Sequence, residues 1–381
     1  MEHPGTIPPG RAQQWATRII FLLSGLAMSA WAPLVPFVKL RLGINDGVLG
    51  LLLLCLGAGS IFSMPLTGYL TNKLGCKTVI LLAGILLCID LPLLTLMDSG
   101  LGMALALLLF GAAIGMIDVA MNVHAVIVEK ASGRAMMSGF HGFFSLGSIL
   151  GALLVSGMLS LALSPFIASL VVVAFTLLSL ATMSKHLWND KKDKQDGPML
   201  VLPRGWVIFL GLLCFVMFMV EGSMLDWSAL FLMNERGINS HQAGLGYTLF
   251  AIAMTLGRLF GDRIVNSLGR YKVLLLGSLL AFIGLIMAVS IDSLYALIAG
   301  FIMVGFGASN LVPIVFTAAG NQTAMPANLA IASVTTLGYA GILSGPALIG
   351  FIAQISSLPI ALCCVAVSLL LVTASARAVT R

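Results

Sequence analysis

Residues 68–77 read Gly-Tyr-Leu-Thr-Asn-Lys-Leu-Gly-Cys-Lys, a short polar stretch between two long apolar runs. Residues 261–272, Gly-Asp-Arg-Ile-Val-Asn-Ser-Leu-Gly-Arg-Tyr-Lys, also lie between two apolar runs and repeat the Asn-x-Leu-Gly core of the first stretch. A glycine next to basic residues predicts a tight turn between two helices, with its cations at the polar face of a membrane. The two copies therefore indicate a membrane protein with two similar halves.

The composition supports a protein that lies within a bilayer. Of the 381 residues, 59% are hydrophobic and 9% are charged, and the mean hydropathy is +1.08. A soluble domain has about 25% charged residues, so this composition excludes a water-soluble globular protein. The apolar runs are continuous, whereas a membrane β-barrel would show short alternating segments. The sequence contains no P-loop, HExxH or GxSxG motif, so neither ATP-driven pumping nor standard hydrolase chemistry has support.

The lengths of the apolar runs predict the number of membrane crossings, because a spanning helix needs about 20 residues. The runs lie at approximately 16–38, 47–71, 77–97, 101–128, 135–160, 164–184, 205–233, 242–264, 272–290, 294–319, 328–353 and 358–378. The long polar stretch 185–204 separates the first six runs from the last six. We predict an all-α membrane protein with twelve transmembrane helices in two pseudo-symmetric six-helix bundles, 1–184 and 205–381, joined by a central cytoplasmic loop.

The basic residues predict the orientation of the chain. With both termini in the cytoplasm, all but three of the 20 basic residues fall on the cytoplasmic side, the exceptions being Lys39, Arg41 and Arg236. The same orientation places Trp31 and Trp227 near the outer interface, where tryptophans often anchor a membrane protein. The basic residues therefore predict that both termini lie in the cytoplasm.

Glycines repeat at a fixed offset of 194 residues. The pairs are Gly43/Gly237, Gly50/Gly244, Gly75/Gly269, Gly111/Gly305, Gly147/Gly341 and Gly151/Gly345. Gly43-Ile44-Asn45 likewise corresponds to Gly237-Ile238-Asn239, and Asn45 is a good N-cap for the helix that follows. An even number of spans in each half makes the halves parallel repeats, the plan of transporters that rock two bundles about a central site.

Residues 68–77 resemble the signature between the second and third helices of the major facilitator superfamily, and residues 261–272 resemble it more loosely. Asp118-Val-Ala-Met-Asn122, Glu129, Ser138-Gly-Phe-His141 and residues 221–227 resemble the fucose-permease-like branch, in particular its YbjJ-type bacterial inner-membrane proteins. The resemblance implies that the protein lies in the bacterial inner membrane. It also implies a gate in which the acid of the signature pairs across the two halves. Asn72 stands in place of that acid, so the gate role could rest on Asp262 with Arg258 or Arg263. The alternative is a plain topogenic loop. The gate candidates are Asn72, Lys73, Gly75, Arg258, Asp262 and Arg263.

Acids inside the spans are the clearest functional signal, because each costs about 2.5–3.5 kcal/mol at mid-bilayer. The four are Asp90, Asp118, Glu221 and Asp226. We expect no cationic side chain deep in any span, so Asp118 and Glu221 are candidates for reversible protonation. His141 is a third proton-coupling candidate. For Asp118 and Glu221 the alternative is a neutral acid that bonds to a neighbouring helix. For His141 and His124 a hydrogen bond between helices is favoured over a proton relay.

Asp118 and Asn122 are four residues apart and therefore share one face of a helix. The resemblance implies that helices 1, 4, 7 and 10 line the cavity. The candidate substrate-binding residues are Asn122, Glu221, Asn310, Trp31, Trp227 and Asp226. Interface anchoring explains the two tryptophans equally well.

These features predict a secondary transporter that moves a small solute by alternating access, with proton coupling and with a sugar or sugar-like metabolite as the favoured solute. One alternative is an efflux transporter for amphipathic or drug-like compounds, and a second is a non-transporting receptor or assembly partner on the same fold. We expect no enzyme activity, no cofactor and no metal. The expected partners are the small-molecule substrate, protons and the lipid bilayer, with no nucleic acid, and the expected state is a monomer.

Overall fold

The computed structural model describes residues 10–188, 202–237 and 244–380. Most of the predicted loop 185–204 lies outside the described residues, as do Ile238 and Asn239 of the repeat. Every regular element in the described part of the chain is a helix. The prediction of an all-α fold is therefore confirmed.

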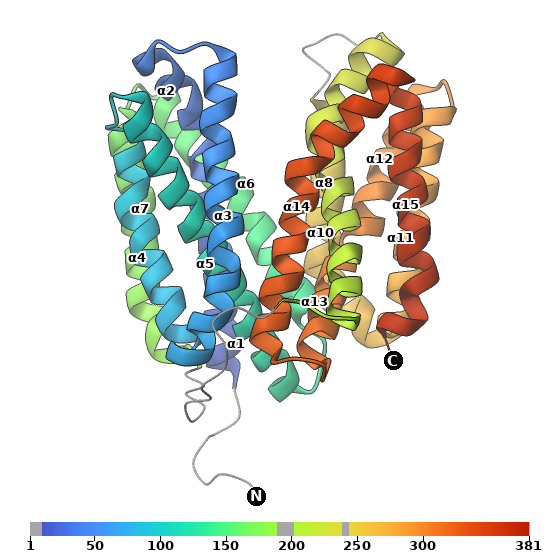
Figure 1. The fold of residues 1–381 in the computed structure, drawn as a ribbon, viewed down its shortest axis with the longest axis horizontal. Coiled ribbons are helices and arrows are strands. Elements are labelled where there is room, and N and C mark those ends of the chain that lie inside the picture. Colours follow the sequence, from blue (N-terminus) through green and yellow to red (C-terminus); the bar gives the residue numbers. More distant parts are fainter. Residues whose placement is uncertain (1–9, 189–201, 238–243, 381) are drawn as a thin grey trace, which may run out of the picture. The chain divides into compact units, whose positions relative to one another are not determined.

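The helices of the first half lie side by side along a common direction (Figure 1). They are α1 (Arg11–Ala30), the 3₁₀ turn η1 (Ala32–Leu34), α2 (Val35–Leu42), α3 (Asp46–Leu74), α4 (Cys76–Leu94), α5 (Gly100–Ser132), α6 (Met137–Ser160), α7 (Pro165–Met183) and η2 (Ser184–His186). The side chain of Asn45 caps α3, since its Oδ1 atom accepts a hydrogen bond from the backbone N–H of Val48 at 2.9 Å.

The helices of the second half are α8 (Trp206–Arg236), α10 (Leu245–Leu268), α11 (Arg270–Ser290), α12 (Leu294–Ala308), α13 (Leu311–Asn321), α14 (Ala327–Ile355) and α15 (Leu358–Val379). In the described part of the chain, 11 helical stretches are long and apolar enough to cross a membrane. The 24 residues of α10 also suffice for a crossing, although this helix carries Arg258, Asp262 and Arg263. Together these helices account for the twelve predicted spans.

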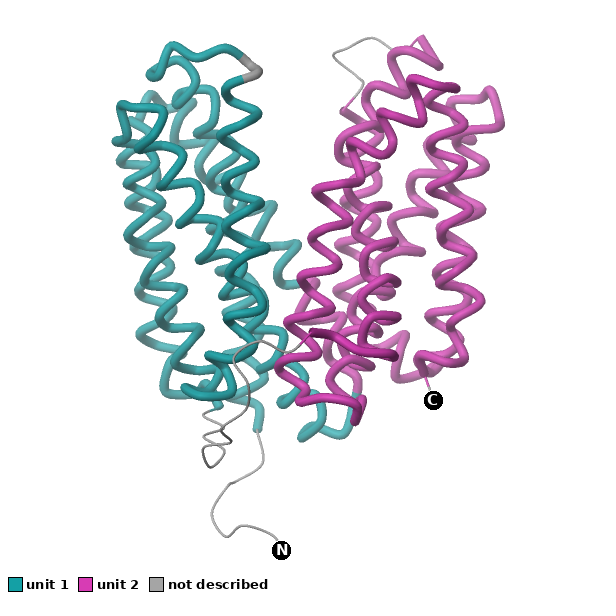
Figure 2. Tube along the Cα trace, viewed as in Figure 1, with its two compact units in different colours: residues 1–134, 143–201 teal, residues 135–142, 202–381 magenta. Residues whose placement is uncertain are grey.

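The chain forms two compact units (Figure 2). Unit 1 contains residues 1–134 and 143–201, and unit 2 contains residues 135–142 and 202–381. Residues 135–142, which include the start of α6, therefore cluster with the second half, although the predicted division counts them with the first.

Two matching turns confirm the repeat at the level of the backbone. Gly75 ends α3 and begins α4 with φ 81° and ψ 152°, and Gly269 connects α10 to α11 with φ 82° and ψ 152°. A side chain at such a positive φ would be strained, so glycine is required at both turns. The same sequence core therefore produces the same turn in each half.

Helix crossings repeat as well. A Cβ atom at Gly147 on α6 would overlap the carbonyl oxygen of Leu22 on α1, and one at Gly341 on α14 would overlap that of Phe215 on α8. Small residues permit such close approach of helix backbones in membranes. The prediction that Gly147 and Gly341 lie at equivalent close crossings is confirmed.

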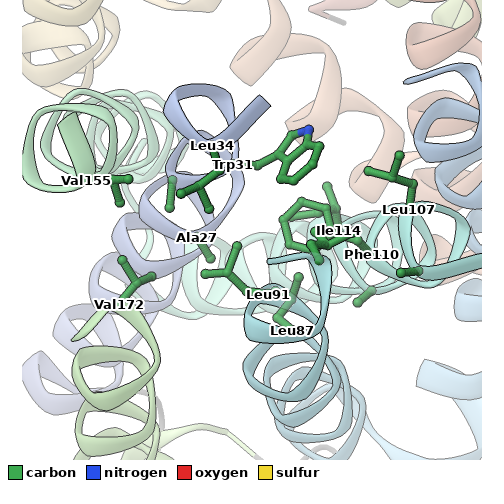
Figure 3. Packing of buried hydrophobic residues seen from close by; sticks show 14 of the residues in the cluster. Ala27, Trp31, Leu34, Leu87, Leu91, Leu107, Phe110, Ile114, Val155 and Val172 are labelled. Carbon is green, nitrogen blue, oxygen red and sulfur yellow. The ribbon is translucent and has the colours of Figure 1, made fainter. Parts of the chain in front are cut away.

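Trp31 directly follows α1 and lies in the apolar core of unit 1, and its predicted places near the outer interface and in a substrate site stay predictions. Its side chain is 5% exposed and packs against Phe110 on α5, with ring centroids 6.5 Å apart (Figure 3). The turn η1 follows α1 directly, and Leu34 at its end belongs to the same apolar cluster as Trp31.

The tenth predicted span, 294–319, is two helices, because Ser309 and Asn310 interrupt it between α12 and α13. Pro313 explains the break: it has no N–H to donate to the carbonyl of Ser309 four residues earlier, and its ring clashes with that carbonyl in a continuous helix. The interruption leaves a polar backbone group inside the membrane, which must find another partner.

Candidate functional site

A buried arginine completes the interrupted helix. Arg258 on α10 donates from Nε to the carbonyl oxygen of Ser309 at 3.4 Å. Its Nη2 atom also lies 3.3 Å from both Oε1 and Oε2 of Glu221 on α8. The arginine side chain is 6% exposed, and that of Glu221 is 29% exposed. Three helices of unit 2 therefore meet at one charged group.

This ion pair overturns one expectation. We expect no cation deep in a span from the sequence, but Arg258 is a buried partner of Glu221. The physical reason is the carbonyl left without a donor by Pro313, which draws the guanidinium to the helix interruption. Once the arginine is buried there, a carboxylate nearby offsets its charge. The gate role of Asp262 with Arg258 or Arg263 stays a prediction.

Asn310, a predicted substrate contact, packs into the same interruption. Its Nδ2 atom donates to the carbonyl oxygen of Gly257 at 3.3 Å and to Oγ of Ser309 at 2.9 Å. Its Oδ1 atom is buried and has no hydrogen-bond partner among the described residues. Asn310 therefore holds α10 against the α12–α13 junction, and its unpartnered oxygen is a polar group beside the Arg258 site.

Asp226 and Trp227 follow Glu221 along α8. Asp226 is exposed, while Trp227 is half-buried and packs against Gly350 on α14. The indole nitrogen of Trp227 is buried without a hydrogen-bond partner among the described residues. Neither residue contacts the Arg258 pair in any interaction that the structure defines.

In unit 1 the predicted pair on α5 does come together. Asn122 donates from Nδ2 to the backbone oxygen of Asp118 at 2.9 Å and to its Oδ1 atom at 3.3 Å. Both side chains are buried. The four-residue spacing thus places a carboxamide directly on the carboxyl group, where it can orient that group in either protonation state.

Asp262 and Asn266, one helical turn apart on α10, hold the segment 135–142 within unit 2. Oδ1 of Asp262 accepts a hydrogen bond from the backbone N–H of Gly139 at 2.8 Å. Asn266 accepts from the N–H of Ala135 at 3.0 Å and donates to its carbonyl oxygen at 2.9 Å. These contacts satisfy backbone groups at the start of α6, where a carboxylate is also favoured by the helix dipole.

The other gate candidates lie on the surface or at the turn. Lys73 is exposed with its ammonium 5.8 Å from the ring centroid of Tyr69, Arg263 is exposed, and Asn72 is half-buried before Gly75. Asn266 corresponds to Asn72 in the repeat, so the contact to Ala135 shows one use of an asparagine at this signature position. Their gate role stays a prediction.

The two buried histidines have different surroundings. His124 on α5 accepts at Nε2 from the backbone N–H of Trp188 at 2.9 Å, and its Nδ1 atom lies 3.2 Å from Oγ1 of Thr17 on α1. This confirms the helix-to-helix interpretation and assigns the proton to Nδ1. His141, in the segment 135–142, is buried with its ring 5.7 Å from that of Phe316 on α13. Its role in proton coupling stays a prediction.

Asp90 on α4 is the most isolated of the predicted acids. It is 1% exposed, and neither carboxylate oxygen has a hydrogen-bond partner among the described residues. Within the same described ranges no group of three or more histidines, cysteines or acids is arranged to hold a metal ion.

Sequence analysis missed a role for two of the three outer basic residues. Arg41 donates to the carbonyl oxygens of Leu94, Thr95 and Met97 at the end of α4. In the second half, Arg236 donates to the carbonyl of Val289 at the end of α11 at 2.7 Å. Their departure from the positive-inside pattern was the available signal, since a cation at a helix C-terminus satisfies terminal carbonyls and the dipole.

Comparison with known proteins agrees with this architecture. The family model of the Major Facilitator Superfamily matches residues 18–233 and 208–380. An MFS-type transporter of Yersinia pestis is 65% identical over 379 residues, which cover 100% of this chain and 99% of that protein. A transporter of Sinorhizobium fredii is 34% identical over 342 residues, which cover 89% of this chain and 90% of that protein.

Among solved structures, the fucose:proton symporter FucP of E. coli has the same fold, with a TM-score of 0.79 at 16% identity and with 97% of this chain and 98% of that chain covered. The two family matches together span nearly all of the chain, and each corresponds to one half of the repeat with its signature turn. The chain is a member of the major facilitator superfamily.

Proposed function

We propose that this transporter moves a small polar solute across the bacterial inner membrane by alternating access, coupled to protons. In this proposal residues 1–184 and 205–381 are the two moving bundles, 185–204 is the cytoplasmic loop between them, and both termini are cytoplasmic. The resemblance to the fucose-permease-like branch favours a sugar or sugar-like solute. The protein acts as a monomer.

The observation that carries the proposal is the geometry of Glu221 and Arg258. A strong bidentate arginine–carboxylate pair has two parallel bonds of about 2.7–2.9 Å. Here one nitrogen faces both carboxylate oxygens at 3.3 Å, and the carboxylate side chain is 29% exposed. Such a pair can exchange partners, so a solute hydroxyl can bind to Glu221 while Arg258 keeps its bond to Ser309.

Asp118 is the proposed proton site. A buried carboxylate is stable only when a donor, water or an opposite charge compensates it, and Asn122 supplies one donor at 3.3 Å. Protonation and solute occupancy are then linked, and each changes the affinity of the other by the same factor. His141 is the next candidate for this role.

Arg258 favours a second class of solute, small organic anions. A guanidinium binds a carboxylate bidentately, and a protonated Glu221 would leave Arg258 available for the carboxylate of a solute. Both solute classes belong in one screen, in which sugars, organic acids and amphipathic drugs are compared by the thermal stabilisation of the purified protein. Drug-like ligands alone would indicate the efflux alternative, and no ligand together with no flux would indicate the receptor alternative.

The test of coupling uses proteoliposomes with an imposed pH gradient and the solute found in the screen. Asp118→Asn should abolish uphill accumulation but retain exchange of solute, because the amide cannot take up or release the proton. Glu221→Gln should weaken solute binding more than coupling. Asp98→Asn is the matched control, since Asp98 is an exposed acid of the same unit. Uphill transport by Asp118→Asn at the parental level would refute the assignment of the proton to Asp118.

A further inference from the structure

A cavity of about 200 Å³ lies in unit 2 where four helices end. Its walls include Trp206 at the start of α8, Arg270 at the start of α11, Thr317 and Gln322 at the end of α13, and Thr380 after α15. Pockets for drug-sized ligands begin at about 300 Å³, whereas a water molecule takes about 30 Å³. The cavity therefore fits a group of a few heavy atoms.

Basic residues gather around the cavity. Among the described residues Arg270 is the one ionisable residue of its wall, and no acid is present in the first turn of α11 or of α8. The other basic residues near these helix ends are Arg204, Lys272 and Arg377. Asp262 is the acid at this end among the described residues of unit 2, and its Oδ1 atom is bonded to Gly139. A small anion is the ligand that this charge favours.

The position of the cavity points to the membrane interface. Trp206 stacks on Phe209 with ring centroids 5.0 Å apart, and Tyr271, next to Arg270, is exposed. Aromatic rings of this kind lie at the level of lipid headgroups, and this end of unit 2 carries the basic residues expected on the cytoplasmic side. Basic pockets between membrane helices at that depth suit anionic headgroups.

The wall of the cavity is also held in place. Gln322 donates from Nε2 to the carbonyl oxygen of Met325 at 2.7 Å and accepts at Oε1 from the N–H of Met325 at 3.0 Å. Oγ1 of Thr380 donates to the carbonyl oxygen of Ala376 at 2.8 Å. These bonds hold the segment after α13 and the end of α15 in place at the cavity wall.

We propose that this cavity binds a phosphate group, with Arg270 as the charged contact and with an anionic lipid of the cytoplasmic leaflet as its source. The phosphodiester enters beside Trp206, and the acyl chains lie along the exposed apolar side chains of the adjacent helices. A free phosphate ion or a soluble phosphate ester has the same chemistry, so the experiment must separate these sources.

The experiment measures the melting temperature of the purified full-length protein in detergent. Phosphatidylglycerol or cardiolipin is titrated in one series, phosphatidylcholine in a second, and inorganic phosphate or glycerol phosphate in a third. We expect the first series to raise the melting temperature by a few degrees and to saturate, while the other two have no effect, because a ligand stabilises the state that it binds. Stabilisation by soluble phosphates as well would show that the source is not the lipid.

Arg270→Gln should raise the concentration of anionic lipid needed for half of the stabilisation by at least about tenfold. A change of this size corresponds to the loss of one hydrogen bond to a charged group. Arg270→Lys should retain most of the effect. Lys272→Gln is the matched control, since Lys272 is exposed, lies two residues away on the same helix and is not part of the cavity wall.

An equal loss in Lys272→Gln would overturn the proposal in favour of diffuse attraction to a basic surface. If Arg270→Gln does not fold, native mass spectrometry of the parent, Arg270→Lys and Lys272→Gln counts the retained anionic lipids. The proposal would also be overturned if none of the three proteins retained more anionic lipid than phosphatidylcholine.

Discussion

The Nη2 atom of Arg258 lies 3.3 Å from both carboxylate oxygens of Glu221, which joins two membrane-spanning helices of unit 2. Breaking such a pair costs more for the more deeply buried partner, whose removal also leaves a backbone group without its bond. Arg258→Met should therefore destabilise the protein by about 3 kcal/mol. Glu221→Gln should cost about 1–2 kcal/mol, because the amide oxygen still accepts from the guanidinium.

The measurement is thermal or denaturant unfolding in detergent, with the exposed Glu235→Gln as control. The double variant Arg258→Met/Glu221→Gln should lose less than the two single variants combined, since their effects share one interaction. Strict additivity would show that the pair contributes nothing to the stability of unit 2.

Asp262 should control the chemical exposure of the segment 135–142. Asp262→Asn removes the charge at the start of α6 and weakens the bond to Gly139, so a cysteine placed at Ser138 should react faster with a soluble thiol reagent. Asn72→Asp, which restores the acid of the family signature in the first half, should shift the labelling rate in the opposite direction, because any differential contact shifts an equilibrium between two states. Equal labelling of the parent and both variants would exclude a gate role for Asp262.

The fold could be predicted from the sequence because hydropathy, basic residues and the glycine repeat are properties of whole segments. The turn at Gly75 and the crossing at Gly147 followed from the same repeat. The pairing of Arg258 could not be predicted, because α10 carries charges on several faces and the helix to which Arg258 points depends on rotation about the helix axis. One partner of Arg258 depends on Pro313, 55 residues later in the chain. Because proline has no N–H, the Ser309 carbonyl can accept from the guanidinium instead. The residue type at position 309 gives no sign of this.

Trp31 shows the same difficulty at the end of α1. The sequence places this residue near the end of an apolar run, but it does not say whether the indole faces lipid or a neighbouring helix. That depends on packing against a distant segment, since Phe110 on α5 lies against the ring.

Asp90 should be replaceable by an apolar residue with a gain in stability. Its two carboxylate oxygens have no hydrogen-bond partner among the described residues, so the desolvation of this group is not compensated there. Asp90→Leu should raise the free energy of unfolding by about 1–3 kcal/mol and therefore raise the melting temperature. Asp90→Asn should change both little. A folded Asp90→Leu variant that loses solute accumulation under a pH gradient would instead place Asp90 in the coupling pathway.

Arg41 should matter for stability through the carbonyl groups it caps and not through its acidic neighbour. Arg41→Ala leaves the carbonyls of Leu94 and Met97 without a donor, so we expect a loss of about 1–3 kcal/mol. Asp98→Ala removes an ion pair whose carboxylate is 83% exposed, and it should cost less than about 0.5 kcal/mol. Arg236→Ala and Asp292→Ala form the equivalent test in the second half, where the carboxylate is 92% exposed. Equal losses within either pair would contradict the capping interpretation.

Gly147 and Gly157 lie on the same helix, α6, and should respond to the same substitution with opposite signs. A Cβ atom at Gly147 would overlap the carbonyl oxygen of Leu22, and the backbones of α6 and α1 would have to separate. Gly147→Ala should therefore destabilise unit 1 by about 1–3 kcal/mol, the cost of overpacking. At Gly157 nothing lies within 4 Å of such an atom, so Gly157→Ala should stabilise the helix by about 0.5–1 kcal/mol through lower backbone entropy in the unfolded chain. The measurement is the melting temperature of each variant. The added atom and the helix are the same in both. A loss of stability in both variants would therefore come from helix propensity or membrane insertion and not from the crossing with α1.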